Sequence, residues 1–298
     1  MTLFTGLSAF PLTPRDAAGR VMTQTLHAML DRVMAARPDS IGLLGSTGGY
    51  AYLAAEERKR VLRLALERVA GRVPVVVGVG ALTTDEAVDL ARDARAAGAD
   101  GLLLAPMSYH PLTDDEVFAH VSAVAVAGGL PLCLYNNPGT TKFTFSPALI
   151  ARLSKVAHVA AVKMPLPADG DFAGELARLR GMVPPGFAVG YSGDWGAKDA
   201  LLAGADGWFS VVAGLLPGAA VALTRAARAG DTAEAARFDA AFGPLWTLFR
   251  ELGSFRVMFE IADVLGLGQP VPPRPILPLG PDLRPLIAQA VAAVRDIG

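Results

Sequence analysis

One lysine stands out among the residues of this chain that could do covalent chemistry. The chain has five lysines in 298 residues, and Lys163 alone directly follows an apolar run, 159–162. Burial at the end of such a run disfavours the charged form of an amine, and a neutral amine is the nucleophile that forms a Schiff base with a carbonyl compound. The alternative interpretation is a lysine that forms a salt bridge at the end of a strand.

Two further features have residue types suited to such chemistry. Tyr135 ends another apolar run, and a phenol there can move protons to and from an imine. Alternatively, Tyr135 is a strand-end aromatic residue with a satisfied hydroxyl. The loop Gly45-Ser46-Thr47-Gly48-Gly49 precedes a helix that we expect to begin near Ala54. Its backbone N–H groups and two hydroxyls could hold a carboxylate, although a flexible turn can have the same composition.

Eight apolar runs that alternate with helical patterns must position these residues. Successive runs start 20 to 35 residues apart, which is the length of a βα unit. Continuous apolar runs are typical of parallel strands buried on both faces. We therefore predict an α/β fold, a (β/α)8 TIM barrel. The alternative is an open doubly wound sheet, but the G-x-G-x-x-G motif is absent after the first strand. The runs begin at Gly6, Ile41, Val75, Gly101, Pro131, Val159, Phe187 and Gly207.

The end of the chain lacks strand signals. Three helical patterns follow residue 225, at 232–252, 254–266 and 282–296. We predict a catalytic barrel over residues 1–225 and a C-terminal helical extension over 226–298. In such a barrel the active site lies at the C-terminal ends of the strands, so Lys163, Tyr135 and the 45–49 loop are expected at one end of the molecule.

Short signals mark helix ends within the barrel. Thr83 with Glu86, and Thr113 with Glu116, match the N-terminal signature of a helix. The segment Ala-Gly-Ala-Asp-Gly occurs twice, at 97–101 and 203–207, each time directly before a predicted strand. Glycine at a helix end is a common stop signal, so the repeat supports a repeated βα architecture.

Composition restricts the class of protein. Hydrophobic residues make up 52% of the chain, which excludes intrinsic disorder. Because 27 Lys+Arg nearly balance 28 Asp+Glu, neither nucleic acid nor a membrane surface is expected as a partner. Proline and glycine interrupt the longest uncharged runs, and the N-terminus does not resemble a signal peptide, so we expect a cytoplasmic protein without a membrane span. The single cysteine, Cys133, and four scattered histidines predict no disulfide and no metal site.

Several short motifs occur in one order along nearly the whole chain. With them the chain resembles the dihydrodipicolinate synthase/N-acetylneuraminate lyase family of pyruvate-handling class I aldolases. Each motif is weak alone, and their order and spacing make the resemblance specific. The motifs are GLSAFP (6–11), GSTG (45–48), Pro106, YNNP (135–138), Val162-Lys163, Ser192-Gly193-Asp194 and PPRP (272–275).

The resemblance implies a role for each matched residue. Lys163 would form an imine with the keto carbon of a 2-oxo acid, and Tyr135 would relay protons. Ser46 and Thr47 would hold the substrate carboxylate. No cofactor or metal is then needed, and the family implies a homo-oligomer, either a tetramer or a dimer. Further candidates for substrate binding are Gly48, Tyr109, Thr140, Asp194, Trp195 and Ser210.

Three departures from the family pattern bear on the substrate. Gly49 stands where the family has glutamate. Met107-Ser108 replaces a pair of tyrosines, one of which completes a proton relay across a subunit interface in the synthases, and Tyr109 lies one position late. Thr140 stands where the synthases place an arginine for the distal carboxylate of the aldehyde, and loss of a bidentate guanidinium changes recognition. These departures argue against dihydrodipicolinate synthase activity proper.

Trp195 is a fourth position of interest. Sialic acid lyases have an acidic residue there that binds sugar hydroxyls. A tryptophan could instead stack on an apolar or aromatic aldehyde. The alternative interpretation is a tryptophan at the start of a helix that packs on the barrel rim.

The resulting hypothesis is a lysine-dependent lyase that makes or cleaves a carbon–carbon bond between pyruvate and an aldehyde. One alternative enzyme is a dehydratase of a 2-keto-3-deoxy sugar acid, which would use the same imine to expel water. A non-catalytic binder of 2-oxo acids on the same fold is the alternative without enzyme activity.

Overall fold

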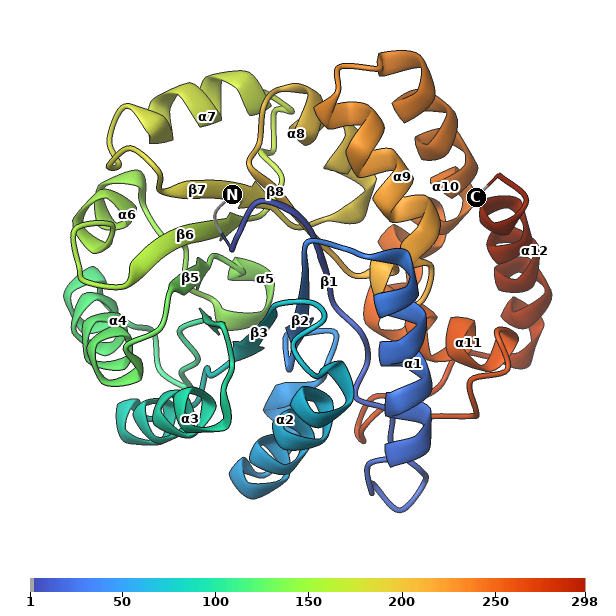
Figure 1. The fold of residues 1–298 in the computed structure, drawn as a ribbon, viewed down its shortest axis with the longest axis horizontal. Coiled ribbons are helices and arrows are strands. Elements are labelled where there is room, and N and C mark those ends of the chain that lie inside the picture. Colours follow the sequence, from blue (N-terminus) through green and yellow to red (C-terminus); the bar gives the residue numbers. More distant parts are fainter. Residues whose placement is uncertain (1–2, 298) are drawn as a thin grey trace.

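Eight parallel strands form a closed barrel in the computed structural model, which describes residues 3–297. Each strand pairs with the next along the chain, and β8 closes the ring on β1 (Figure 1). The predicted (β/α)8 TIM barrel is thus confirmed. The strands are β1 (Gly6–Ala9), β2 (Ser40–Leu43), β3 (Val75–Gly78), β4 (Gly101–Leu104), β5 (Leu132–Tyr135), β6 (Val159–Met164), β7 (Ala188–Tyr191) and β8 (Gly207–Ser210).

Helices follow the strands and surround the barrel (Figure 1). Both predicted helix starts are confirmed, because the Thr83 hydroxyl accepts from the Glu86 N–H and Thr113 forms a reciprocal capping box with Glu116. Four 3-10 turns lie between longer elements, η1 (Tyr50–Tyr52), η2 (Asp194–Gly196), η3 (Val212–Gly214) and η4 (Pro281–Leu283). The helices up to the end of the barrel are α1 (Thr23–Ala36), α2 (Ala55–Val69), α3 (Thr84–Ala97), α4 (Asp114–Gly128), α5 (Pro138–Thr141), α6 (Pro147–Leu153), α7 (Phe172–Arg180), α8 (Ala197–Leu202) and α9 (Pro217–Arg228).

Three further helices gather at one side of the barrel, beside α9 (Figure 1). They are α10 (Thr232–Leu252), α11 (Ser254–Val264) and α12 (Arg284–Arg295), and they lie in the three helical patterns of the sequence. Helix α10 packs on α8 and α9 and also contacts α11 and α12. Helix α9 runs across the boundary predicted after residue 225. Among the helices of residues 3–297, none is both long and apolar enough to cross a membrane.

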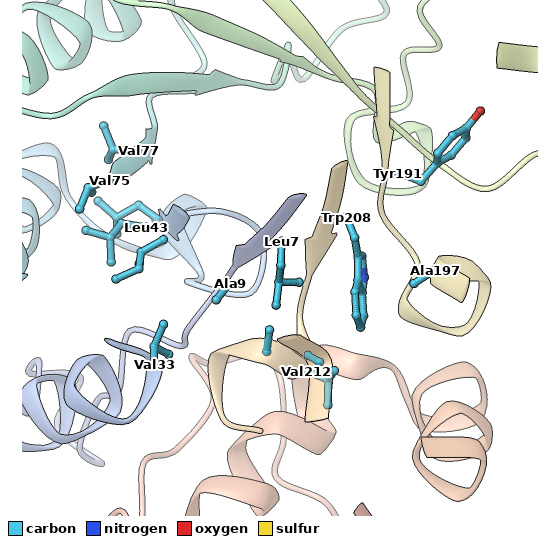
Figure 2. Packing of buried hydrophobic residues seen from close by; sticks show 14 of the residues in the cluster. Leu7, Ala9, Val33, Leu43, Val75, Val77, Tyr191, Ala197, Trp208 and Val212 are labelled. Atoms are coloured by element: carbon cyan, nitrogen blue, oxygen red, sulfur yellow. The ribbon is translucent and has the colours of Figure 1, made fainter. Parts of the chain in front are cut away.

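The strands bury side chains on both faces and so create two cores. Outward side chains, among them Leu7, Val75 and Trp208, pack against the helices (Figure 2). Inward side chains alternate with them along the strands and fill the barrel. This smaller interior cluster includes Val76, Leu103, Cys133, Tyr135, Ala161 and Phe209. Burial on both faces explains why the strands appear in the sequence as continuous apolar runs.

Aspartates placed just before strands explain the repeated Ala-Gly-Ala-Asp-Gly segment. Asp100 precedes β4 and accepts the N–H of Val75, the first residue of β3, at 2.7 Å. Asp206 precedes β8 and accepts the N–H of Val189 in β7 at 2.9 Å. The carboxylates thus accept from backbone N–H groups at the N-terminal end of the barrel, where the neighbouring strand has not yet begun. The repeat is a structural device, far from the C-terminal strand ends.

Glycine in β2 makes room for an aromatic ring inside the barrel. Phe10 follows β1, and its ring is fully buried. A Cβ atom at Gly42 would lie 2.2 Å from Cζ of Phe10, and one at Gly45 would lie 2.7 Å from Cδ1 of the same ring. Real carbon atoms do not approach so closely, so the ring occupies space that only glycine leaves open.

We therefore expect the substitution Gly42→Ala to destabilise the protein. Overpacking of a close-packed interior typically costs about 1–3 kcal/mol, and urea denaturation should detect a loss of this size. Gly218→Ala is the matched control, because Gly218 is exposed in α9 and nothing lies within 4 Å of its added Cβ. That change should be neutral or stabilising by up to about 1 kcal/mol through helix propensity. Equal stability of the two variants would contradict the packing argument.

Candidate active site

Lys163 lies inside the barrel, surrounded by aromatic rings. It is the fifth residue of β6, and only 4% of its surface is exposed. The distances from Nζ to the ring centroids are 4.1 Å for Tyr135, 4.2 Å for Phe10 and 5.5 Å for Phe209. Within residues 3–297 the amine has no carboxylate at salt-bridge distance, so the alternative of a salt-bridged lysine is not what this structure contains.

A bulge in β6 directs Lys163 inward. Val159 pairs with Leu132 of β5, but the next residue of β5, Cys133, pairs with Ala161. The extra residue, Ala160, shifts the alternation of side chains by one. Val159 belongs to the outer core and Ala161 to the interior, so Lys163, two residues after Ala161, also points into the barrel. Without the bulge the lysine would face the helices.

The hydroxyl of Tyr135 lies in a small polar network at the end of β5. Its oxygen accepts from Nδ2 of Asn137 at 3.1 Å and from Oγ of Ser46 at 3.4 Å. The Asn137 amide also donates to Ser46 at 3.3 Å. Because Tyr135 is the register partner of Lys163 on the neighbouring strand, this network connects the 45–49 loop with the amine. The structure thus brings together three of the predicted site residues.

The 45–49 loop has the shape of an anion cradle. Leu44 adopts a left-handed φ of 53° just before it, and Gly49, its last residue, has φ 62°. A non-glycine residue in this region is strained, and such strain is concentrated at functional sites. Inside residues 3–297 the backbone N–H groups of Ser46, Thr47 and Gly48 have no acceptor, so they are free for a carboxylate.

Asp194 is buried, and protein donors occupy both of its carboxylate oxygens. Oδ1 accepts from the indole of Trp208 at 3.0 Å and from the Val211 N–H at 3.1 Å, and Oδ2 accepts from the Val212 N–H at 2.6 Å. Burial raises the pKa of this carboxyl from 3.8 to about 6, against the effect of these donors and of the charge on Lys163. In this structure Asp194 ties β7 to the turn after β8.

The remaining predicted residues have contacts of their own, and within residues 3–297 no hydrogen bond joins any of them to Lys163. Tyr109 is 91% exposed and contacts the ring of His110. Thr140 is exposed and donates to the Asn137 carbonyl at 3.3 Å. Trp195, in η2, is 38% exposed, and the Ser210 hydroxyl is buried and accepts from the Ala213 N–H. Their contacts with substrate stay predictions. Across residues 3–297, no three His, Cys, Asp or Glu side chains lie together as a metal site requires.

Sequence reasoning did not select several residues that the structure places at the site. Phe10 and Phe209 face the amine, and Asn137 bonds the Tyr135 hydroxyl. Asn137 belongs to the YNNP motif, and its amide, two residues after Tyr135, is a sequence feature that indicates a place in the site. Tyr50, directly after the 45–49 loop, is 7% exposed, with Arg58 over its ring. Its position next to a glycine-rich loop, as an aromatic residue with a hydroxyl, is the sequence feature that indicates a place in the site.

Comparison with known proteins places this arrangement in a family. The model of the dihydrodipicolinate synthetase family matches residues 3–294. The chain belongs to this family. It is therefore an enzyme of the carbon–carbon lyase type, as the sequence predicts.

The curated relatives are similar over most of the chain. A 4-hydroxy-tetrahydrodipicolinate synthase from Methylibium petroleiphilum is 34% identical over 292 residues, 96% of each chain. One from Methylococcus capsulatus is 38% identical over 224 residues, 75% of each chain. Similarity of this extent shows the family of the chain.

Solved structures agree with the fold over its whole length. A dihydrodipicolinate synthase from Agrobacterium tumefaciens is 56% identical, covers 98% of both chains and has a TM-score of 0.96. A prophage protein of the dihydrodipicolinic acid synthase family from E. coli K12, solved in complex with pyruvate, is 27% identical, covers 99% of both chains and has a TM-score of 0.90.

Proposed function

We propose that this enzyme makes or cleaves a carbon–carbon bond between pyruvate, or another 2-oxo acid, and an aldehyde through an imine on Lys163. The observation that carries the proposal is the environment of the Lys163 amine. It is buried among three aromatic rings and has no carboxylate partner in residues 3–297. Such an amine can attack a carbonyl carbon, and the ring faces favour the positive charge of the protonated imine that follows.

The chain supplies the groups that the reaction needs. Lys163 adds to the keto carbon, and loss of water gives the protonated imine, while the free N–H groups of the 45–49 loop hold the carboxylate. Tyr135 gives a proton to the departing water and then takes one from the adjacent methyl carbon, which gives an enamine. Its carbon attacks the aldehyde carbon, and the aldehyde oxygen takes a proton from Tyr135. Addition of water to the imine then releases a 4-hydroxy-2-oxo acid and the free lysine, so no external cofactor enters the balance.

The aldehyde is proposed to lack the distal carboxylate that the family's synthases bind. Thr140 has no positive charge, and its hydroxyl donates to the Asn137 carbonyl. The cation nearest in sequence, Lys142, is exposed and donates from Nζ to the Gly139 carbonyl at 3.2 Å. Helix α5 therefore has no arginine that could bind a carboxylate through two parallel hydrogen bonds. The curated relatives are named as synthases, and a comparison of two aldehydes separates this proposal from synthase activity.

Trapping of the imine tests the proposal. The enzyme is incubated with pyruvate and borohydride, and peptide mass spectrometry then locates the reduced adduct. We expect the adduct on Lys163, and we expect Lys142→Ala to leave both its yield and its position unchanged. An unmodified protein, or an adduct on another lysine, would refute the mechanism.

Product analysis then separates the reactions that share this imine. Pyruvate is offered with aldehydes matched in size, such as butyraldehyde and succinic semialdehyde, which differ by a terminal carboxylate. Faster coupling of the uncharged aldehyde supports the proposal, and preference for the carboxylate would favour a synthase-like substrate. Loss of water from a 2-keto-3-deoxy sugar acid with its carbon chain intact would instead identify a dehydratase.

A further inference from the structure

Tyr50 presents a hydroxyl at the end of the barrel that contains the imine lysine. It begins η1, immediately after the 45–49 loop, and it is buried, whereas Tyr52 of the same turn is 46% exposed. A Cβ atom at Gly80 would lie 3.3 Å from the Tyr50 hydroxyl oxygen and 2.8 Å from the Ala105 carbonyl. Gly80 and Ala105 follow β3 and β4, so the hydroxyl lies between the C-terminal ends of these strands, where such barrels have their active sites.

A buried cation lies over the ring of Tyr50. The Arg58 guanidinium is 5.2 Å from the ring centroid and donates to the carbonyls of Gly80 and Gly78, both at 2.9 Å. In the described part of the chain it has no carboxylate at salt-bridge distance. Its positive charge therefore acts on the phenol, where it stabilises negative charge that develops on the oxygen during proton transfer.

The Tyr50 hydroxyl has no hydrogen-bond partner within residues 3–297, unlike the hydroxyl of Tyr135. Burial, and after it the charge of Tyr135, raises the pKa of Tyr50 above its ordinary value, and the charge of Arg58 acts in the opposite direction. Tyr50 therefore stays protonated at neutral pH and can donate and accept at once. Within residues 3–297 the two hydroxyls share no direct hydrogen bond, so a proton transfer between them would run through a water molecule or the reacting oxygen.

We propose that Tyr50 is a positioning residue that passes protons between Tyr135 and solvent during the imine reaction. The inference rests on the proposed function of Lys163 and Tyr135 and adds the route by which Tyr135 is restored. When Tyr135 gives its proton to the aldehyde oxygen, the bridging water gives a proton to Tyr135 and takes one from Tyr50, which is reprotonated from solvent. The proton that Tyr135 takes from the methyl carbon exchanges with solvent along the same path, and in the cleavage direction each transfer is reversed.

The geometry gives this role to Tyr50 rather than to Tyr109. Tyr109 is almost fully exposed, and its contact within the described chain is the ring of His110. It could act only through a second copy of the chain. Tyr50 needs no second copy, since Gly49 allows the turn that brings its ring inward and Arg58 holds the ring in place.

Exchange of the methyl hydrogens of pyruvate with deuterium oxide tests the route. The exchange requires an imine, removal of a carbon-bound proton and its transfer to solvent, and NMR follows it without any aldehyde. Tyr50→Phe keeps the ring and its contact with Arg58 and removes only the hydroxyl. We expect exchange to fall roughly 10²-fold, while the equilibrium yield of borohydride-trapped imine and the melting temperature stay within error of the wild type.

Two companion variants make the result specific. Tyr52→Phe, on the exposed side of the same turn, should exchange at the wild-type rate. If Tyr50→Phe also exchanges within twofold of the wild type, or if Tyr109→Phe alone shows the loss, the proposal for Tyr50 is wrong although the imine stands. If the wild type forms no trapped imine, the proposed function itself has failed, and the two failures are thus distinguishable.

Discussion

Lys163→Ala is expected to lower kcat/KM for the coupling of pyruvate with an aldehyde by on the order of 10⁴-fold or more. Removal of a covalent nucleophile has effects of this size in other enzymes, because the remaining groups still bind the substrate but no covalent intermediate can form. Lys163→Arg should be equally inactive, since a guanidinium keeps its proton and forms no imine. Initial rates with the coupled aldehyde, measured at saturating and limiting pyruvate, check both variants.

Stability measurements on the same position exclude misfolding as the cause. The amine is buried without a carboxylate partner, and burial of a polar group without such compensation costs free energy. Lys163→Met places a chain of similar length among the same three rings, where sulfur–aromatic contacts are favourable. We expect this inactive variant to melt at or above the wild-type temperature. Activity above about 1% of wild type in any of the three variants would contradict the imine mechanism.

The position of Lys163 illustrates what the sequence could predict of this site. The apolar run before it places the lysine at the end of a buried strand, and the βα spacing assigns that strand to a barrel. Simple alternation from Val159, however, would direct residue 163 to the helices. The bulge at Ala160 reverses this, and it depends on pairing with β5. The register between two strands is not encoded in any local sequence pattern. The inward direction of the Lys163 side chain could therefore be seen only in the structure.

The aromatic surroundings were beyond sequence reasoning for a related reason. Phe10 reaches the amine because Gly42 and Gly45 leave its ring space across the barrel, and Phe209 arrives from the last strand. Neither contact is local. The inward direction of the Tyr50 ring could not be predicted, because it depends on the φ of Gly49 and on packing against Gly80, which follows β3.

Asp194→Ala is expected to destabilise the protein by about 3–5 kcal/mol, because it leaves buried donors of Trp208, Val211 and Val212 without an acceptor. The sequence placed Asp194 among substrate-binding residues, as a polar group at a strand end. The three hydrogen bonds to its carboxylate predict instead that loss of Asp194 lowers the stability of the fold. Asp100→Ala is the control, since Asp100 is an exposed residue whose carboxylate satisfies one backbone donor at the other end of the barrel, and its loss should cost only about 1–3 kcal/mol. Chemical denaturation of both variants measures the difference, and similar losses would contradict the argument.

The pH dependence of stability gives a second test of Asp194. Its pKa is raised from 3.8 in the unfolded chain to about 6 in the folded protein, so between these values the folded state binds more protons than the unfolded state. Stability from this group is therefore present at low pH and is lost as pH rises through about 6. Asp194→Asn cannot titrate. The stability of the wild type relative to this variant should fall by up to about 3 kcal/mol between pH 4 and pH 6.5, at about 1.4 kcal/mol per unit of pKa. A difference that is constant with pH, or one that grows, would show that the buried donors outweigh desolvation and keep the carboxylate charged.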